Sequence, residues 1–261
     1  MKLKIYQVDA FSSRVFKGNP AAVCILEEWL DDKLMQHIAN ENNLSETAFA
    51  VPVDERYEIR WFTPEVEVDL CGHATLATAH VLFNHLGYPS SRVEFDSVHS
   101  GILAVEKNGK LLTLDFPADS LEEMVIPEII ATALHKPPLK AFRGKTDFMF
   151  IYASQSEIES MKPDFGLLAQ VGGRGIIVTA MGNEVNFVSR FFAPQAGINE
   201  DPVTGSAHTS LTPYWARVLG KNKLTAQQLS ARGGQLICEL AGDRVLISGE
   251  AVSYLEGELL I

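Results

Sequence analysis

The sequence of 261 residues predicts an α+β protein built from two similar halves. Two stretches indicate a duplication, residues 60–74 and residues 190–207. Each has an arginine-aromatic-phenylalanine strand, a proline, an acidic or polar run, and a helix start of the form glycine-polar-alanine. Arg60 and Arg190 lie 130 positions apart, which is half of the chain. We expect each half to order its elements as strand, helix, strand, strand, loop, helix and further strands.

In the first half, period-two alternation and short apolar runs predict strands at residues 3–9, 21–26, 45–51, 57–62, 93–97, 102–107 and 111–116. One helix should follow the Asp31-Asp32 pair, because an aspartate is a favoured N-cap. A second helix should run from Gly72 to about Asn84. Asn108-Gly109 is a hairpin signal between the last two strands.

Prolines gathered at residues 117–138 predict the boundary between the halves. We therefore expect domains at 1–118 and 119–261, with the option that the C-terminal strand returns to the first half. Helices are expected near 128–134, at 163–171 and from Gly205. The last of these is either cut short near Pro213 or continues as Tyr214–Leu219. Strands are expected at residues 148–153, 175–180, 185–192, 235–240, 244–248 and 256–261.

The composition excludes several classes of protein. With 46% hydrophobic and 21% charged residues, the chain should form a packed globular core. A formal charge of −11 argues against nucleic acid or an anionic membrane as partner. Three scattered cysteines make no disulfide framework, and no signal-peptide pattern or apolar run of about 20 residues is present. We expect a cytoplasmic protein.

The paired helix starts predict the chemistry. Helix N-termini present unpaired N–H groups and a partial positive charge, and Gly72 and Gly205 let a ligand approach the backbone. Such ends suit a carboxylate and the enolate-like charge formed when a neighbouring C–H loses its proton. The alternative is that both glycines only allow close packing of helix on sheet.

Proton transfer also needs an acid/base group. Glu46 heads an otherwise apolar strand and is the candidate base, the alternative being a solvated acid at a strand end. His73 follows Gly72 and is a candidate acid/base or donor. Asp69 and Asp201 are each a helix cap or a site acid, and capping is the favoured role for Asp69. Cys71 is matched by Thr204, so no cysteine pair for racemisation exists. No histidine, cysteine and carboxylate spacing indicates a metal site.

Four motifs in order resemble the PhzF-like phenazine biosynthesis isomerases, which have the diaminopimelate epimerase-like fold. The motifs are Asp9-Ala10-Phe11 with Gly18-Asn19-Pro20-Ala21, Asn43-Leu44-Ser45-Glu46-Thr47-Ala48-Phe49, Phe62-Thr63-Pro64 with Cys71-Gly72-His73-Ala74-Thr75, and Glu200-Asp201-Pro202-Val203-Thr204-Gly205-Ser206-Ala207. The resemblance spans most of the chain.

The resemblance implies two pseudo-symmetric domains, each a barrel-like, mostly antiparallel sheet around a central helix, with the active site in the cleft between them. It implies that Glu46, His73 and Asp201 are catalytic. It implies substrate binding by Asn19, Gly72, Gly205 and Ser206. It further implies a homodimer that works without cofactor.

We therefore expect a cofactor-independent isomerase that moves a proton on a small carboxylate, either amino-acid-like or dihydroaromatic. Two alternatives stay open at this point. One is an amino-acid racemase, epimerase or hydroxy-amino-acid dehydratase on the same fold. The other is a carboxylate-binding protein without turnover.

Overall fold

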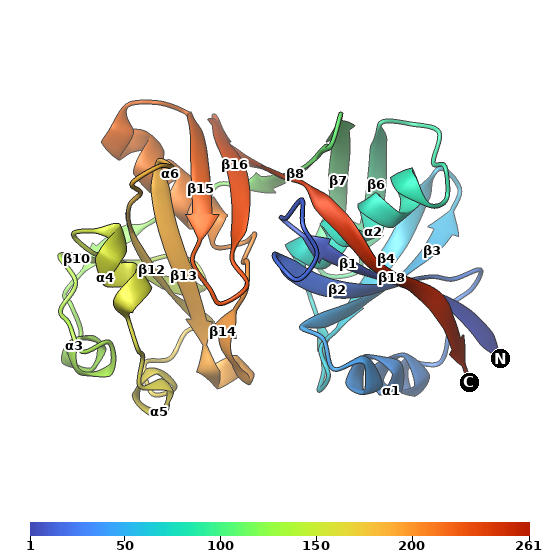
Figure 1. The fold of residues 1–261 in the computed structure, drawn as a ribbon, viewed down its shortest axis with the longest axis horizontal. Coiled ribbons are helices and arrows are strands. Elements are labelled where there is room, and N and C mark those ends of the chain that lie inside the picture. Colours follow the sequence, from blue (N-terminus) through green and yellow to red (C-terminus); the bar gives the residue numbers. More distant parts are fainter. The chain divides into compact units, whose positions relative to one another are not determined.

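The computed structural model describes all 261 residues, and the chain divides into two compact units (Figure 1). Unit 1 comprises Met1–Asp115 and Ser248–Ile261, and unit 2 comprises Phe116–Ile247. The crossing into unit 2 thus lies three residues before the boundary expected from the prolines. None of the helices is long and apolar enough to cross a membrane.

Unit 1 contains the helices α1 and α2 and most of the strands that the sequence predicts. Its elements are β1 Lys2–Ala10, β2 Asn19–Ile25, α1 Asp32–Asn42, β3 Glu46–Val53, β4 Arg56–Phe62, β5 Glu67–Val68, α2 Gly72–Asn84, β6 Arg92–Ser97, β7 Gly101–Asn108, β8 Leu111–Pro117 and β18 Ala251–Leu260. The ends of β8 and of β17 (Arg244–Gly249) pass the division between the units.

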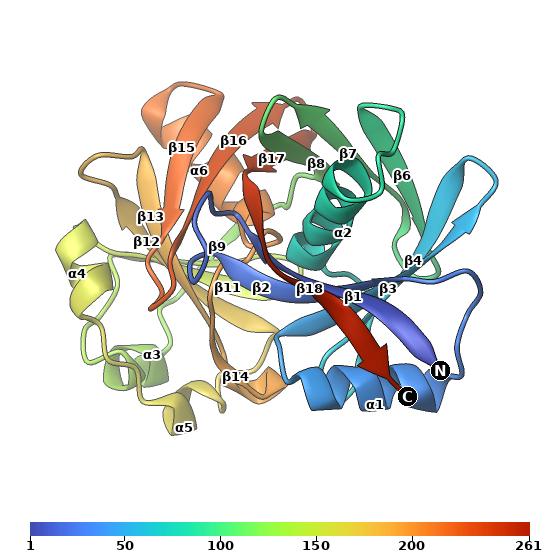
Figure 2. The same ribbon diagram turned by 45° about the vertical axis from the view of Figure 1, so that its right-hand side comes forward.

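The sheet of unit 1 wraps around α2. Its strands pair in the order β18-β1-β2-β3-β4, then β6, β7 and β8, and only β2–β3 and β4–β6 are parallel. Helix α2 is apolar on nearly all sides and contacts β1, β2, β3, β7 and β18 (Figures 1 and 2). A helix that is apolar all round must be buried, which makes α2 the core of this unit.

Unit 2 repeats this arrangement around α6. Its elements are β9 Glu122–Met124, α3 Glu128–Ala133, β10 Lys140–Arg143, β11 Asp147–Ile151, α4 Gln155–Ser160, α5 Phe165–Leu168, β12 Gly175–Met181, β13 Phe187–Ala193, the 3-10 turn η1 Pro194–Ala196, β14 Ile198–Asp201, α6 His208–Leu219, β15 Lys223–Gln228 and β16 Gly234–Ala241.

The strand pairings of the two units correspond one by one. The chain β10-β11-β12-β13 pairs as β1-β2-β3-β4 does, with β11–β12 parallel like β2–β3. Strand β13 then carries β14 antiparallel and β15 parallel, as β4 carries β5 and β6. The predicted α+β fold of two pseudo-symmetric domains is therefore confirmed.

The start predicted for the second central helix is wrong, and of the two courses predicted after Pro213 the structure shows the continuation to Leu219. Helix α6 begins at His208, because Gly205 and the next two residues form a tighter turn in which His208 N–H donates to Gly205 O (2.9 Å). The helix also continues through Pro213. Proline cannot donate to the carbonyl of Thr209, but that carbonyl accepts the Asp119 N–H instead (3.1 Å).

The helix expected at 163–171 exists but is shorter than predicted. Only Phe165–Leu168 is helical, capped by the Asp164 carboxylate on Leu167 N–H (3.0 Å), and the separate helix α4 precedes it. Gly172 has φ +81° and ends this segment, since that conformation favours glycine.

Candidate active site

Three predicted site residues of unit 1 lie together at one end of its sheet. Asn19 opens β2, Glu46 opens β3 and His73 lies in the first turn of α2. Because β2 and β3 are parallel and Ala21 pairs with Glu46, the starts of both strands meet at the same edge. The start of α2 lies against these strands, so one acid, one amide and one imidazole converge.

Glu46 and His73 form the centre of this cluster. The Glu46 Oε2 lies 3.1 Å from His73 Nε2, and the two side chains are only 14% and 6% exposed. The distance allows an ion pair, but the angles miss hydrogen-bond geometry, and neither atom has another partner. Buried polar atoms without partners are costly, so a pair of them facing each other indicates a site that reacts or binds.

Asn19 and Ser45 control the other ring nitrogen of His73. The Asn19 Nδ2 lies 3.1 Å from His73 Nδ1, and the Ser45 hydroxyl donates to Asn19 Oδ1 (3.3 Å). This network assigns Nδ1 as acceptor and leaves the proton on Nε2, facing Glu46. If His73 gains a second proton, the Asn19 amide can turn over and accept from Nδ1, because the Ser45 hydroxyl accepts as well as donates.

Electrostatics favour a proton on His73. Burial lowers the pKa of His73, but attraction to Cys71 and Glu46 outweighs this, and the pKa lies well above its ordinary value. Burial and the negative charge of Glu46 raise the pKa of the Cys71 thiol. Cys71 therefore stays protonated and uncharged near neutral pH. In that pH range the charge that raises the pKa of His73 is the negative charge of Glu46.

Cys71 completes a chain of three groups. Its Sγ lies 3.5 Å from His73 Nδ1, whereas Glu46 is nearest to Nε2. One ligand atom from each of these three residues lies within 4.8 Å of the others, which is close enough for a cation. We assign no metal, because each ring nitrogen of His73 already faces a protein partner.

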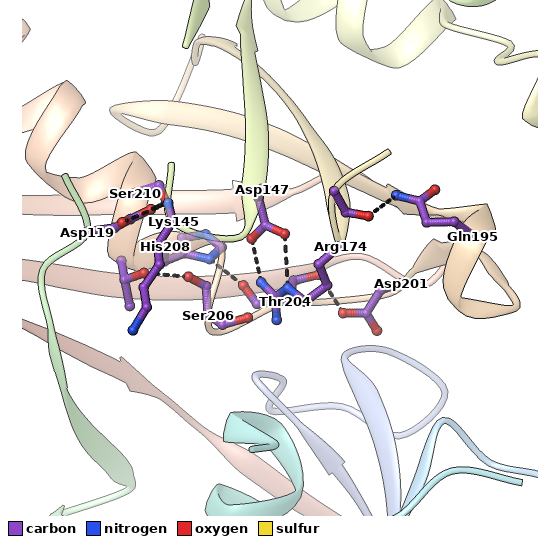
Figure 3. Close-up of polar contacts among 12 residues, drawn as sticks. Asp119, Lys145, Asp147, Arg174, Gln195, Asp201, Thr204, Ser206, His208 and Ser210 are labelled. Carbon is purple, nitrogen blue, oxygen red and sulfur yellow. Dashed lines mark hydrogen bonds and ion pairs between the residues drawn. The ribbon is translucent and has the colours of Figure 1, made fainter. Parts of the chain in front are cut away.

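In unit 2, the counterpart of Cys71 is Thr204, and it is fully engaged (Figure 3). The Thr204 hydroxyl donates to Asp201 Oδ2 (2.5 Å) and accepts from Gln228 Nε2 (3.2 Å). The Gln228 Oε1 also accepts the Thr204 N–H (2.9 Å). The network thus orients Asp201, a predicted site residue, and uses the hydroxyl proton of Thr204.

Both central helices begin without a capping side chain. Cys71 precedes Gly72 and makes no side-chain cap, and Ala207 before α6 makes none either. In unit 2, Gly205 and Ser206 form the turn that leads into α6. N–H groups at such starts are available to a ligand in each unit.

Sequence reasoning missed Ser45 and Gln228. Ser45 lies inside a quoted motif, but its role depends on the amide that it orients. Gln228 is fully buried in β15. The one sequence signal for it is that a polar residue takes an inward-facing position of an alternating strand. Asp69 was expected to cap α2, which is wrong, because its carboxylate lies 3.8 Å from His99 instead.

The duplicated sheet around two central helices defines an epimerase-like fold. A crystal structure of a hydroxyproline epimerase from Agrobacterium vitis matches 99% of this chain and 92% of its own, with TM-score 0.65. At 10% identity this likeness shows the shared fold alone. The predicted diaminopimelate epimerase-like fold agrees with it.

The chain belongs to the phenazine biosynthesis-like protein family, which it matches over residues 8–257. It is 53% identical over 259 residues to a Pseudomonas aeruginosa protein named an uncharacterized isomerase, with 99% of each chain covered. A crystal structure of an Enterococcus faecalis PhzF-family protein has 48% identity and TM-score 0.98 over all of both chains. The protein is accordingly an isomerase of this family.

Proposed function

We propose that this isomerase moves a proton on a small carboxylate substrate without a cofactor, with Glu46 as the acid/base group. The observation that carries the proposal is the buried Glu46–His73 pair, 3.1 Å apart, whose facing atoms have no other partner. A carboxylate held in a poorly hydrated site beside a proton-bearing imidazole suits general acid/base catalysis.

In the proposed reaction, Glu46 takes a proton from a carbon near the substrate carboxylate. The electron pair moves into the conjugated system, and His73 Nε2–H stabilises the negative charge that develops. The Glu46 carboxyl then returns the proton to another carbon, so no proton or electron is gained or lost overall. Asn19 and Ser45 support this role by keeping His73 Nδ1 as the acceptor, so that the proton stays on Nε2 throughout.

The substrate carboxylate is proposed to bind N–H groups at an uncapped helix start, including those of Gly72 and His73. Gly205 and Ser206 offer the same kind of donors at the start of α6, and Asp201 is proposed to orient the substrate or its amine. Their roles, like that of Asn19, remain predictions that substitution tests one at a time.

Substitution of Glu46 tests the assignment. Glu46→Gln should abolish incorporation of solvent deuterium into any substrate found by screening amino and hydroxy acids in heavy water. Glu122→Gln is the matched control, because Glu122 opens β9 and is exposed. Circular dichroism checks the fold. Deuterium exchange at the wild-type rate in Glu46→Gln would refute the proposal.

A Cys71-dependent racemase or dehydratase is the second candidate, favoured by the contact between Cys71 Sγ and His73. Against it, the Thr204 hydroxyl proton is already donated to Asp201. Cys71→Ala separates the two: loss of activity supports the thiol reaction, and retained activity removes it. A protein that only binds carboxylates would show saturable binding but no exchange with any ligand.

A homodimer, a cytoplasmic location and a biosynthetic role belong to the same proposal. The homodimer and the biosynthetic role rest on the resemblance of the motifs, and the cytoplasmic location rests on the composition of the chain. Sedimentation equilibrium of the full chain tests the dimer, and a single species at the monomer mass of 28.7 kDa would contradict it.

A further inference from the structure

Unit 2 has a counterpart of the edge that carries Glu46 in unit 1. In unit 1 the parallel strands β2 and β3 start with Ala21 paired to Glu46. In unit 2 the parallel strands β11 and β12 start with Asp147 paired to Gly175. The same place in the repeated fold therefore holds different chemistry in the two units.

The residues just before these pairs carry the difference. Asn19 lies two positions before Ala21, and Lys145 lies two positions before Asp147. Ser45 lies just before Glu46, and Arg174 just before Gly175. Unit 2 thus replaces an amide and a hydroxyl with an ammonium and a guanidinium.

Arg174 is held in one orientation but keeps free donors (Figure 3). Its Nε donates to Asp147 Oδ1 (2.9 Å) and its Nη2 donates to Oδ2 of the same carboxylate, which is 3% exposed. Three of the five guanidinium N–H groups have no partner, and the side chain is 42% exposed. The group also lies 5.5 Å over the Phe191 ring, which fixes its plane.

Lys145 lies beside it on the same edge. The backbone N–H of Arg174 donates to Thr146 O (2.8 Å), which joins the two segments. Asp119 accepts from the Lys145 N–H (3.2 Å) and from the Ser210 hydroxyl (2.7 Å), so it ties this loop to the first turn of α6. The Lys145 ammonium is exposed and has no partner.

The nearby carboxylates leave N–H donors of Arg174 and Lys145 without a partner. Both oxygens of Asp147 accept hydrogen bonds from Arg174. The oxygens of Asp119 accept hydrogen bonds from the Lys145 backbone N–H and the Ser210 hydroxyl. Asp201 accepts from Thr204 through Oδ2, and its charge and that of Asp119 also attract Arg174 without a hydrogen bond to it. What remains exposed on Arg174 and Lys145 is therefore donors only, and a planar guanidinium edge matches a carboxylate.

We propose that Arg174 and Lys145 form a binding site for a carboxylate group, with Arg174 as the planar fork and Lys145 as the second cation. The carboxylate belongs either to the isomerase substrate or to a separate small acid. The binding claim stands on unit 2 alone and does not depend on the proposed reaction.

Titration with malonate tests the site. In ¹H–¹⁵N spectra of the full chain, malonate should shift the amides of 144–147 and 174 in a saturable way. Arg174→Gln with Asp147→Asn, which leaves no unpaired buried charge, should weaken binding at least tenfold. Lys145→Gln should weaken it about threefold to tenfold. Lys162→Gln is the control, because Lys162 is exposed in the same unit.

The outcomes separate cleanly. Unchanged malonate affinity in the Arg174/Asp147 variant, or shifts confined to other residues, would overturn the proposal. If the double variant does not fold, Lys145→Gln and Arg174→Lys decide it, since the second keeps the charge and loses the fork. Once a substrate is known, competitive inhibition by malonate would assign the site to the carboxylate of that substrate. If bound malonate leaves deuterium exchange into the substrate unchanged, the site binds a separate acid.

Discussion

Asn19 is the residue through which the protonation of His73 can be tested without a substrate. A carboxylate placed 3.1 Å from Nδ1 would favour the imidazolium, so Asn19→Asp should raise the pKa of His73 by a further ~1–3 units. The pKa is measured by NMR titration of the imidazole C–H signals. A lower or unchanged pKa in Asn19→Asp would show that Asn19 does not control this nitrogen.

His208 makes the stability of the protein depend on pH, because its pKa is lowered, whereas that of His73 is raised. It is fully buried, and burial lowers its pKa to about 4 despite the hydrogen bond to Thr204 O. The unfolded chain binds this proton first, with a pKa of about 6.5, so stability is lost as pH falls from about 6.5 to about 4. A difference of that size corresponds to about 3 kcal/mol.

His208→Thr isolates this contribution. The counterpart of His208 in unit 1 is Thr75, whose hydroxyl donates to Cys71 O (2.6 Å), so a threonine can keep the equivalent bond. Urea unfolding at pH 7, 5.5 and 4.5 should show a smaller loss of stability with acid in the variant. His80, whose pKa also lies at about 4, remains in both proteins as the common background. Equal pH dependence would contradict the assignment.

At the scale of the element, the start of β12 explains why only unit 1 carries a base. A Cβ on Gly175 would lie 2.1 Å from a ring carbon of Phe191, so the ring fills the space that a glutamate there would need. Gly175→Ala should therefore lower the free energy of unfolding by about 1–3 kcal/mol. Phe191→Leu should recover part of this loss in the double variant. A simple sum of two losses in a denaturant titration would refute the steric explanation.

Local patterns predicted α2 well and α6 poorly, for a physical reason. All the signals for α2 lie within it, and it begins at Gly72 and ends at Asn84 as expected. The continuity of α6 through Pro213 depends on Asp119, which is far away in the sequence and satisfies the carbonyl of Thr209. Such a long-range compensation cannot be seen in the helix sequence.

The same limit applies to the candidate site. Glu46, His73 and Asn19 were chosen from motifs, but only the structure gives the 3.1 Å contacts between them and the role of Ser45. Arg174 went unnoticed because nothing near it in the sequence reveals its partner Asp147, which it meets through the parallel pairing of β11 and β12.

For the whole molecule, the repeated arginine shows how far the two copies have diverged. Arg60 binds Glu67 and Asp32 and lies over the Phe62 ring, and Arg190 binds Glu200 and lies over the Phe192 ring. The Asp32 side chain is 74% exposed, so water can hydrate its carboxylate when the Arg60 guanidinium is removed. Arg190 is 11% exposed and also donates to two backbone carbonyls of unit 2.

Removing the charge should therefore cost more in the second copy. We expect Arg190→Gln to destabilise unit 2 by about 3 kcal/mol, because it leaves the Glu200 carboxylate, which is only 20% exposed, and two backbone carbonyls without donors. Arg60→Gln should destabilise unit 1 by about 1 kcal/mol or less. Native-state hydrogen exchange measures each unit through its own amides, which a single melting temperature cannot do. Equal losses of stability in the two units would contradict this expectation. In that case the double variant Arg190→Gln with Glu200→Gln should be no more stable than Arg190→Gln alone.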